Sequence, residues 1–439
     1  MRWTRRTRLA GLLGLTMLLA ATACGSDDTA PPDRNGDLAQ PTPVVEGYDP
    51  PQHFHQSSAI ALPEAAAHLS GGGWYASDTG KPAVTLLGIH AYVAVPDGLH
   101  IVDVITGETI DVIEPEQRPL RTSENTRIVG NSAHPPLVTD VGGAQAVLVP
   151  FLAEITGQGT AASRDVIEVV AVSTENQEVL WRHLIETADC GGMSAYDCDM
   201  TVVGASDGVA VLGVADDNGT PLASYGIDVA GPTTKWELDD FAATMVTGEL
   251  TVGALSSGFL ESYTVAYETS NGTEQRWIDD DDTYALSMQP AGPHWVLTTS
   301  PYGANDRIRL IDPQTGEPVP TEVDGLSAGM RCEYDGSSVV VCFTTDDGLS
   351  TATAVAFDAQ SAEVLWSLPD ENGGRVAPTV RSAWHGLVYG ETSNGPVILD
   401  ARSGRDAVLD PGIAPRVVNE YVGVALADSG GLLAYRTRG

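Results

Sequence analysis

The side chains of this sequence that could take part in chemistry are few, and none forms a complete catalytic set. The run Asp279–Asp282 could bind a cation, but consecutive carboxylates repel one another and lack EF-hand spacing, so we expect a solvated loop. His53 and His55 could place two metal ligands on one strand face, with no third ligand nearby. The sequence contains no GxSxG, HExxH or phosphate-binding glycine loop. We therefore predict no catalytic residue, no cofactor and no metal.

Residues 1–23 are typical of a secretory leader. Four Arg residues at positions 2–8 precede the apolar stretch Leu9–Ala20. That stretch is shorter than the ~20 residues that span a bilayer. Small residues then lead to Cys24, a pattern that resembles the lipobox of bacterial lipoproteins, although Ala21 stands where that family prefers Leu. The resemblance implies that Cys24 is acylated and anchors the chain at the extracytoplasmic face of the cell membrane. An ordinary secretory signal with an incidental Cys is the alternative.

Residues 24–52 contain many Pro and Asp and few apolar side chains, which predicts a disordered tether. The folded part should then run from residue 53 to residue 439. The whole chain has 59 Asp and Glu against 23 Lys and Arg, a net charge of −36, and removal of the leader makes the balance more negative. Such a surface repels phosphates, which excludes nucleic-acid binding.

Four cysteines remain after Cys24, and an even number in an exported chain favours disulfides. Cys332 and Cys342 flank an Asp–Gly turn and should lie on neighbouring strands. We expect the second disulfide to join Cys190 to Cys198. Zinc binding would need a CxxC or CxxxC spacing, which neither pair shows.

The elements that hold these residues repeat along the chain. A short apolar run, an Asp-type turn and a second apolar run recur with a period of about forty residues, which predicts a radial array of small sheets. Aligned on the turn, the repeats place Ser173, Thr269 and Tyr435 where five others place an Asp, and four contain a Trp at a fixed distance after the turn. The repeat positions are Asp103, Asp228, Asp312, Asp358 and Asp400 for the Asp, and Trp181, Trp236, Trp277 and Trp366 for the Trp.

We predict an all-β, eight-bladed β-propeller of four-stranded antiparallel blades. The long interval between the first two turns indicates a loop insertion at Glu154–Ser163. Too few residues follow Tyr435 for a last strand, so a strand near Ser57–Leu62 should close the ring.

The phrase apolar–x–apolar–Asp–x–x–Thr–Gly with a following Trp resembles the PQQ-like repeat of quinoprotein-type β-propellers, over roughly residues 55–439. Leu310–Gly316 and Ala356–Trp366 match it best. The resemblance implies that each Trp packs between neighbouring blades and that Thr–Gly forms an outer turn.

Enzymes of that family use a vicinal Cys pair, a carboxylate-bound calcium and a catalytic Asp, and this sequence has no adjacent Cys pair. We therefore expect a non-enzymatic, lipid-anchored propeller that binds or scaffolds an envelope protein. The alternative is a PQQ-dependent dehydrogenase of alcohols or sugars, and a sensor module that cooperates with a membrane kinase is a third possibility.

Overall fold

The computed structural model describes residues 45–67, 81–120, 133–186, 198–216, 219–258, 261–284, 287–300, 307–319, 326, 329–344, 352–370, 374–427 and 429–438. Contacts divide the chain into Met1–Val44 and Val45–Gly439, and all described residues belong to the second unit. The predicted leader, Cys24, the tether up to residue 44 and Cys190 lie outside them. Within the described part of the chain, no helix is long and apolar enough to cross a membrane.

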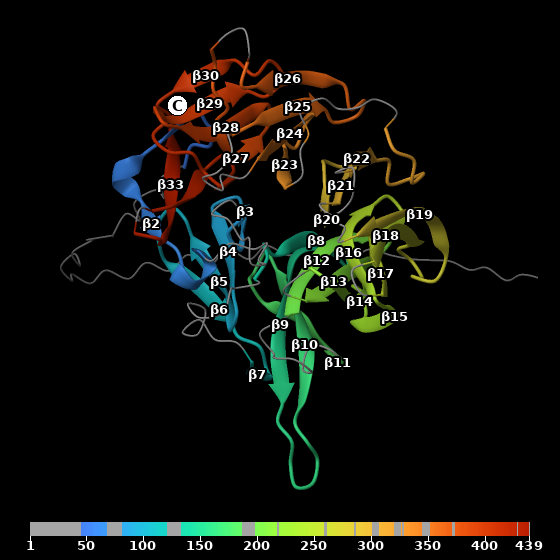
Figure 1. The fold of residues 1–439 in the computed structure, drawn as a ribbon. Coiled ribbons are helices and arrows are strands. Elements are labelled where there is room, and N and C mark those ends of the chain that lie inside the picture. Colours follow the sequence, from blue (N-terminus) through green and yellow to red (C-terminus); the bar gives the residue numbers. More distant parts are fainter. Residues whose placement is uncertain are drawn as a thin grey trace, which may run out of the picture. The chain divides into compact units, whose positions relative to one another are not determined.

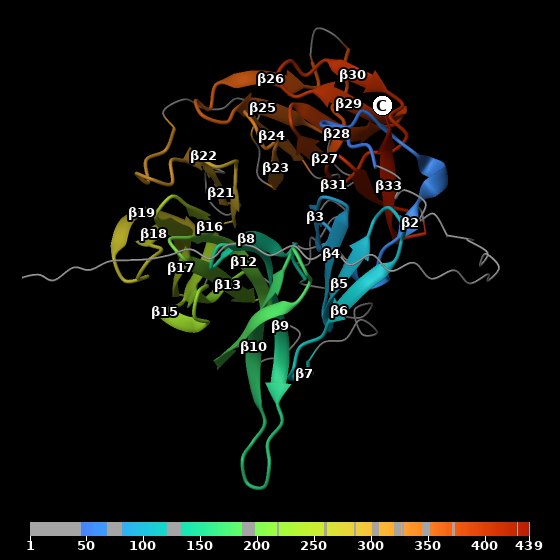
Figure 2. The same cartoon turned by 180° about the vertical axis from the view of Figure 1, so that it is seen from behind.

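The second unit is an all-β, eight-bladed propeller of antiparallel blades, as the sequence predicts (Figures 1 and 2). Blade 1 contains β3 (Val84–Leu87), β4 (His90–Val95), β5 (Gly98–Asp103) and β6 (Thr109–Ile113). Blade 2 contains β7 (Arg118–Pro119), β8 (Leu137–Val141), β9 (Ala144–Ile155), β10 (Arg164–Ser173) and β11 (Val179–Glu186). Blades 3 and 4 contain β12 (Cys198–Ser206), β13 (Val209–Asp216), β14 (Pro221–Asp228), β15 (Thr233–Asp239), and β16 (Phe241–Thr247), β17 (Leu250–Gly258), β18 (Glu261–Glu268), β19 (Gln275–Tyr284).

Blades 5 and 6 contain β20 (Ser287–Pro290), β21 (Val296–Ser300), β22 (Arg307–Ile311), and β23 (Met330–Tyr334), β24 (Val339–Thr344), β25 (Ala354–Asp358), β26 (Val364–Leu368). Blade 7 contains β27 (Thr379–Trp384), β28 (Leu387–Thr392), β29 (Gly395–Asp400) and β30 (Asp406–Leu409). Blade 8 contains β31 (Val417–Val418), β32 (Val422–Leu426) and β33 (Leu432–Arg438), together with β1 (His53–Phe54) and β2 (Ile60–Ala61) from the beginning of the unit. Short 3-10 helices lie at Gln56–Ser58 and Glu64–Ala67. Blade 5 has three described strands and a single bridge, Ile311 to Pro318, in the fourth position.

The N-terminal part of the folded unit closes the ring. β1 pairs with β33 through His53 and Arg438, and β2 pairs with the same strand through Ile60 and Ala434. The last strand of blade 8 therefore comes from the beginning of the unit, which confirms the prediction of a closing strand near residues 57–62. Closure removes two sheet edges that would otherwise be free to aggregate.

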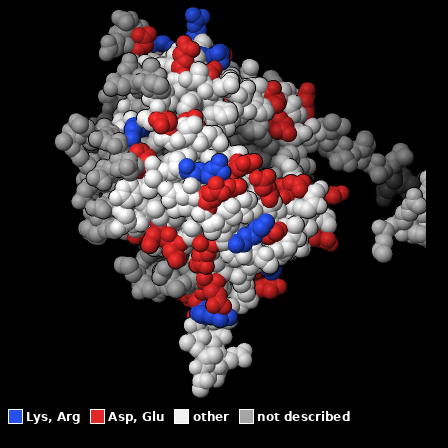
Figure 3. Space-filling model, turned by 90° about the vertical axis from the view of Figure 1, so that its right-hand side faces the viewer, with Lys and Arg blue, Asp and Glu red and all other residues white. Residues whose placement is uncertain are grey.

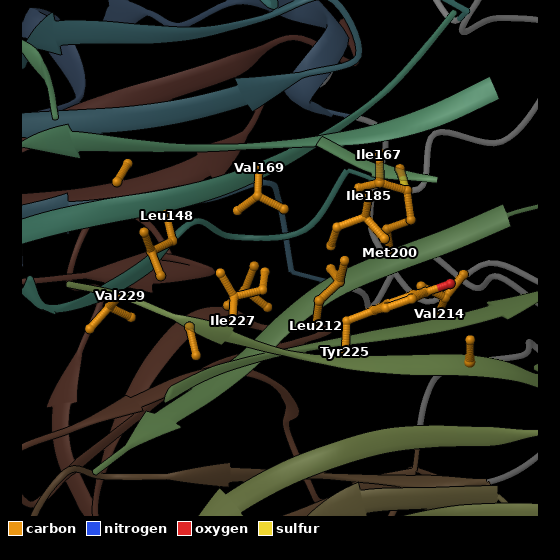
Figure 4. Packing of buried hydrophobic residues seen from close by; sticks show 14 of the residues in the cluster. Leu148, Ile167, Val169, Ile185, Met200, Leu212, Val214, Tyr225, Ile227 and Val229 are labelled. Carbon is orange, nitrogen blue, oxygen red and sulfur yellow. The ribbon is translucent and has the colours of Figure 1, made fainter. Parts of the chain in front are cut away.

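The core lies between the blades, because each sheet is covered on both faces by its neighbours. In β10 the residues from Val166 to Val172 are all fully buried, a pattern that an exposed sheet face would not give. Figure 4 shows the layer between blades 2 and 3, where Ile167 and Val169 face Leu212 and Ile227. Burial of each such side chain contributes about 1.5–3 kcal/mol.

Each seam between neighbouring blades also contains a polar contact. Seven of these contacts satisfy a backbone group, and the pair His134–Asp199 joins two side chains, so they hold neighbouring blades together as well as adding stability. The pairs are Thr85–Pro136, His134–Asp199, Ser224–Phe241, Thr247–Pro293, Gln289–Met330, His385–Asp335, Ser382–Pro415 and Asn419–Gly88, in order around the ring from the seam of blades 1 and 2.

The boundary of the folded body differs from the sequence prediction. Residues 45–52 were expected in the tether, but they pack on blades 7 and 8. The Tyr48 N–H donates to the Glu420 carbonyl at 2.7 Å, and Asp49 accepts hydrogen bonds from Trp384 at 2.9 Å and His385 at 2.5 Å. Composition could not reveal these contacts, because their partners lie more than 300 residues away in the sequence.

Candidate functional site

The recurring aspartates of the repeat form turns. Asp103 Oδ1 accepts the backbone N–H groups of Ile105 at 2.7 Å and Thr106 at 2.9 Å, which ties the turn to the end of the third strand of its blade. Asp228, Asp312, Asp358 and Asp400 accept equivalent bonds from residues two or three positions later. The backbone N–H groups lower the pKa of Asp228 and of Asp358 below the ordinary carboxyl value. The carboxylate of each of these aspartates is therefore already hydrogen-bonded to the backbone of its own turn.

Each repeat Trp joins its blade to the next one. The indole N–H of Trp181 donates to the Val229 carbonyl at 3.0 Å, and that of Trp236 donates to the Thr269 carbonyl at 2.8 Å. Trp277 and Trp366 reach Pro313 and Ala401 at 2.9 and 2.7 Å in the same way. Every acceptor is the residue directly after the turn position of the following blade. A Cβ added at Gly404 would lie 2.7 Å from the Trp366 ring, so this turn needs glycine beside the indole.

Backbone hydrogen bonds correct the sequence alignment at two repeats. In blades 1, 2, 5, 6 and 7 the carbonyl of the turn residue accepts the N–H of the residue four positions later, as Asp400 does from Gly404. In blade 4 this acceptor is Glu268, which bonds Gly272, so Thr269 is one position too late. In blade 8 the N–H of Thr437 takes the place that Ala401 has in blade 7, which moves the equivalent position from Tyr435 to Arg436. The alignment is one residue late at Thr269 because the turn of blade 4 contains one extra residue.

The ends of the strands divide the connections into two faces. We call turn face the end that bears the turns after the first and third strands of each blade, and loop face the end that bears the connections after the second and fourth. The turns between first and second strands are only two residues long at 88–89, 142–143, 207–208, 248–249 and 385–386. On the loop face the connections at 96–97, 240 and 393–394 have one or two residues, whereas the sequence between strand ends is long at 62–83, 120–136 and 187–197, most of which lies outside the described residues. Longer connections favour binding, so the loop face is the candidate site.

An ion pair joins two blades that are not neighbours in the ring. Lys81, which precedes the first strand of blade 1, lies 2.7 Å from Glu333 on the inner strand of blade 6. The inner strands β27 and β31 lie between these two blades in the ring, so the pair joins strands that are not neighbours. Glu333 is 11% exposed and Lys81 is 49% exposed. Burial lowers the pKa of the nearby Arg331, and the charge of Glu333 opposes that shift.

A second polar pair lies where blades 2 and 3 meet on the loop face. His134 Nε2 is 2.5 Å from Asp199 Oδ1, and both side chains are partly exposed. Asp199 follows Cys198, which is disulfide-bonded, while its expected partner Cys190 lies outside the described residues. The predicted pair Cys332–Cys342 is confirmed: these residues face each other on β23 and β24 and form a disulfide.

The candidate metal positions named from the sequence have other surroundings. Asp279 was expected in a loop but lies in β19, opposite Thr264, and pairs with Arg309 at 2.8 Å. His53 lies in the closing strand β1. Across the described ranges, no group of three or more His, Cys, Asp or Glu side chains gathers to hold a metal ion.

Comparison with known proteins gives relatives by fold. No protein-family model and no curated protein matches the sequence. The chain is similar to the dihydro-heme d1 dehydrogenase NirN in complex with DHE, with 14% identity, a TM-score of 0.45 and coverage of 89% of this chain and 74% of that one. It is also similar to the Dos1 propeller, with 10% identity, a TM-score of 0.44 and coverage of 89% and 95%. A Kluyveromyces lactis Hsv2 structure has 11% identity, a TM-score of 0.37 and coverage of 80% and 94%. These similarities assign no activity to this chain.

Proposed function

We propose that this chain is a lipid-anchored, extracytoplasmic propeller that binds another protein of the cell envelope through its loop face. The observation that carries the proposal is the difference between the two faces. Tight turns whose carboxylates and carbonyls are already hydrogen-bonded form one face. The other face bears the extended hairpin and the longest connections, beside short ones at 96–97, 240 and 393–394. Propellers bind through such connections because a rigid ring holds them in fixed positions.

The attachment of the N-terminal segment supports this orientation. Asp49 contacts Trp384 and His385 at the turn between the first two strands of blade 7, and Tyr48 bonds Glu420 at the corresponding turn of blade 8. The chain therefore joins the propeller at the turn face.

The cysteines support an extracytoplasmic location. Cys332 and Cys342 are joined between paired strands, and Cys198 is disulfide-bonded as well. Disulfides of this kind form and persist in oxidising compartments and are rare in the cytosol. The secretory pattern of residues 1–23 is consistent with the same location.

The residues do not fit a quinone cofactor. The sequence has no vicinal Cys pair, and the described residues gather no three carboxylate or imidazole ligands for a calcium ion. The turn aspartates, which are the most regular acidic positions, are engaged by backbone N–H groups on the turn face. We therefore derive no redox step for this protein.

The experiment is crosslinking on intact cells followed by denaturing purification of the full chain and mass spectrometry. A photoreactive reagent suits this chain better than an amine-directed one, because Lys81 and Lys235 are its only lysines. We expect the same envelope protein in replicate captures, and we expect Cys24→Ser to release the chain from membranes. Reduction of a dye by purified protein given PQQ, calcium and an alcohol or sugar would contradict the proposal.

A further inference from the structure

The hairpin between β9 and β10 is longer than any other in the described propeller and projects from it. β9 spans Ala144–Ile155 and β10 spans Arg164–Ser173, and their pairing continues from Ser173 opposite Ala146 to Arg164 opposite Ile155. The hairpin extends beyond the rest of the described body in all three overall views (Figures 1, 2 and 3). It connects a second strand to a third strand, so it belongs to the loop face.

The tip of this hairpin is uncharged on a strongly acidic protein. Residues 155–163 contain no Asp, Glu, Lys or Arg, although the chain has a net charge of −36. In Figure 3 the projection is white, whereas red and blue side chains cover much of the body above it. Thr156 and the residues 158–163 are exposed. Interface cores are depleted of charged residues, and this tip has that composition before any partner is bound.

Charged pairs hold the base of the hairpin. Arg118 lies 2.6 Å from Glu154 on one side, and Arg164 lies 2.8 Å from Glu186 on the other. Deeper in the blade, Glu168 is fully buried, pairs with Arg182 at 2.6 Å and accepts the backbone N–H groups of residues 116 and 117. A buried carboxylate with this set of partners fixes the strand that supports the tip.

The tip is also ordered within itself. The Gly157 N–H donates to Ser163 Oγ at 3.0 Å, and the Ala161 N–H donates to the Gln158 carbonyl at 3.0 Å. A Cβ at position 157 would lie 2.2 Å from the Ala161 carbonyl oxygen, so the two arms approach too closely for any residue but glycine. An element that is already ordered loses little conformational entropy on binding.

We infer that this hairpin is the docking element of the loop face, and that it inserts into an uncharged recess of a protein partner. The inference rests on the proposed binding function and names the site that performs it. A narrow projection buries most of its surface only in a concave site. Hydroxyl and amide side chains at Thr156, Gln158 and Thr160 supply hydrogen bonds there, as do the backbone groups of the tip. Ile155 and two Ala residues give too little apolar area for insertion into lipid.

The test uses the full chain and the envelope protein recovered by crosslinking in cells. Replacement of residues 156–163 by Asn–Gly leaves a two-residue turn between Ile155 and Arg164, which keeps their pairing. We expect this variant to unfold at the same temperature within a few degrees and to lose at least tenfold in affinity. Thr160→Glu should cause a similar loss, whereas Thr160→Ser should bind normally.

The salt dependence of binding and the position of a photocrosslinking residue test the inference further. Affinity should change less than threefold between 50 mM and 500 mM NaCl, because the contact surface is uncharged. A photocrosslinking residue at Thr160 should form the adduct, and one at the exposed Thr106 on the turn face should not. Full affinity in the shortened variant, or binding that weakens steeply with salt, would overturn the inference and leave the proposed function intact. Failure of the full chain to capture any envelope protein would overturn both.

Discussion

At the scale of single residues, the propeller depends on side chains that reach from one blade to the next. Trp236 is 6% exposed and its indole N–H bonds the Thr269 carbonyl, so it contributes both buried area and a satisfied backbone acceptor. The seam between blades 1 and 2 shows how the sequence compensates for a missing Trp. There the Thr174 carbonyl, equivalent to the acceptor that a Trp takes in other seams, is bonded at 3.2 Å by the Gln177 side-chain amide of its own turn in blade 2.

We predict that Trp236→Phe destabilises the protein by roughly 1–2 kcal/mol, because the ring area is mostly kept while the hydrogen bond is lost. Trp236→Ala should cost about 3–5 kcal/mol, since it also leaves a cavity. Chemical denaturation of purified protein measures both. The control is Val376→Ser, at a side chain that is 59% exposed, which should have no measurable effect. Equal stability of Trp236→Phe and the wild type would contradict the role of the indole N–H.

The turn aspartates predict a dependence on pH. The backbone N–H groups of Ser361 and Gln360 lower the pKa of Asp358, with desolvation opposing them. A lowered folded-state pKa stabilises the protein at pH values above the ordinary carboxyl pKa of about 3.9, and this stabilisation is lost as pH falls through the lower folded value.

We therefore expect Asp358→Ala to lower the melting temperature at pH 7, by an amount corresponding to roughly 1 kcal/mol, and to lower it less at pH 3. Melting curves between pH 7 and pH 3 give this difference. Glu108→Ala, at an exposed turn position, serves as the control and should show no such trend. A penalty for Asp358→Ala that stays constant over this range would argue against the turn carboxylate as its cause.

At the scale of elements, the disulfide joins two strands of blade 6 and the closing strands complete blade 8. The Cys332–Cys342 bond closes a short loop, with a sequence separation of 10 residues, on the inner strands of blade 6. We expect replacement of both cysteines by Ala to cost about 2–3 kcal/mol through loop entropy. Thermal unfolding with and without reductant tests this, because reductant should not destabilise the double variant further through this bond. A double variant as stable as the oxidised wild type would contradict the prediction.

Closure of the ring by the N-terminal strands predicts how two truncated proteins behave. Removal of residues 1–44 should leave a stable monomer, because the folded unit begins at Val45. Removal of residues 1–62 takes away β1 and β2 and leaves the outer edge of β33 unpaired. Such an edge is a template for aggregation. Size-exclusion chromatography should therefore show a monomer for the first truncation and aggregates for the second. Monomeric, fully stable protein after the longer truncation would refute closure by the N-terminal strand.

The elements also show how far the sequence could be interpreted without a structure. The period of the Asp turns and the alternation of apolar runs depend on local geometry, so they predicted the blades, the local disulfide and the closing strand. The pairs Lys81–Glu333, His134–Asp199 and Asp49–His385 join residues that lie 65 or more positions apart, and no local pattern marks them. The insertion at residues 154–163 was visible in the repeat spacing, but its projection and internal order were not.

At the scale of the whole molecule, the two faces of the ring have different chemistry. The turn face uses its acidic groups to hold its own backbone and receives the N-terminal segment at blades 7 and 8. The loop face bears the longest connections and the uncharged hairpin.

The most direct measurement of the central claim is photocrosslinking in living cells with one photoreactive residue at a time on each face. Asn394 and Ser429 lie in connections of the loop face, and Gln360 and Ser403 lie in exposed turns of the turn face. The proposed function predicts adducts with one envelope protein from loop-face positions and none from turn-face positions. Adducts formed from the turn face alone would contradict it.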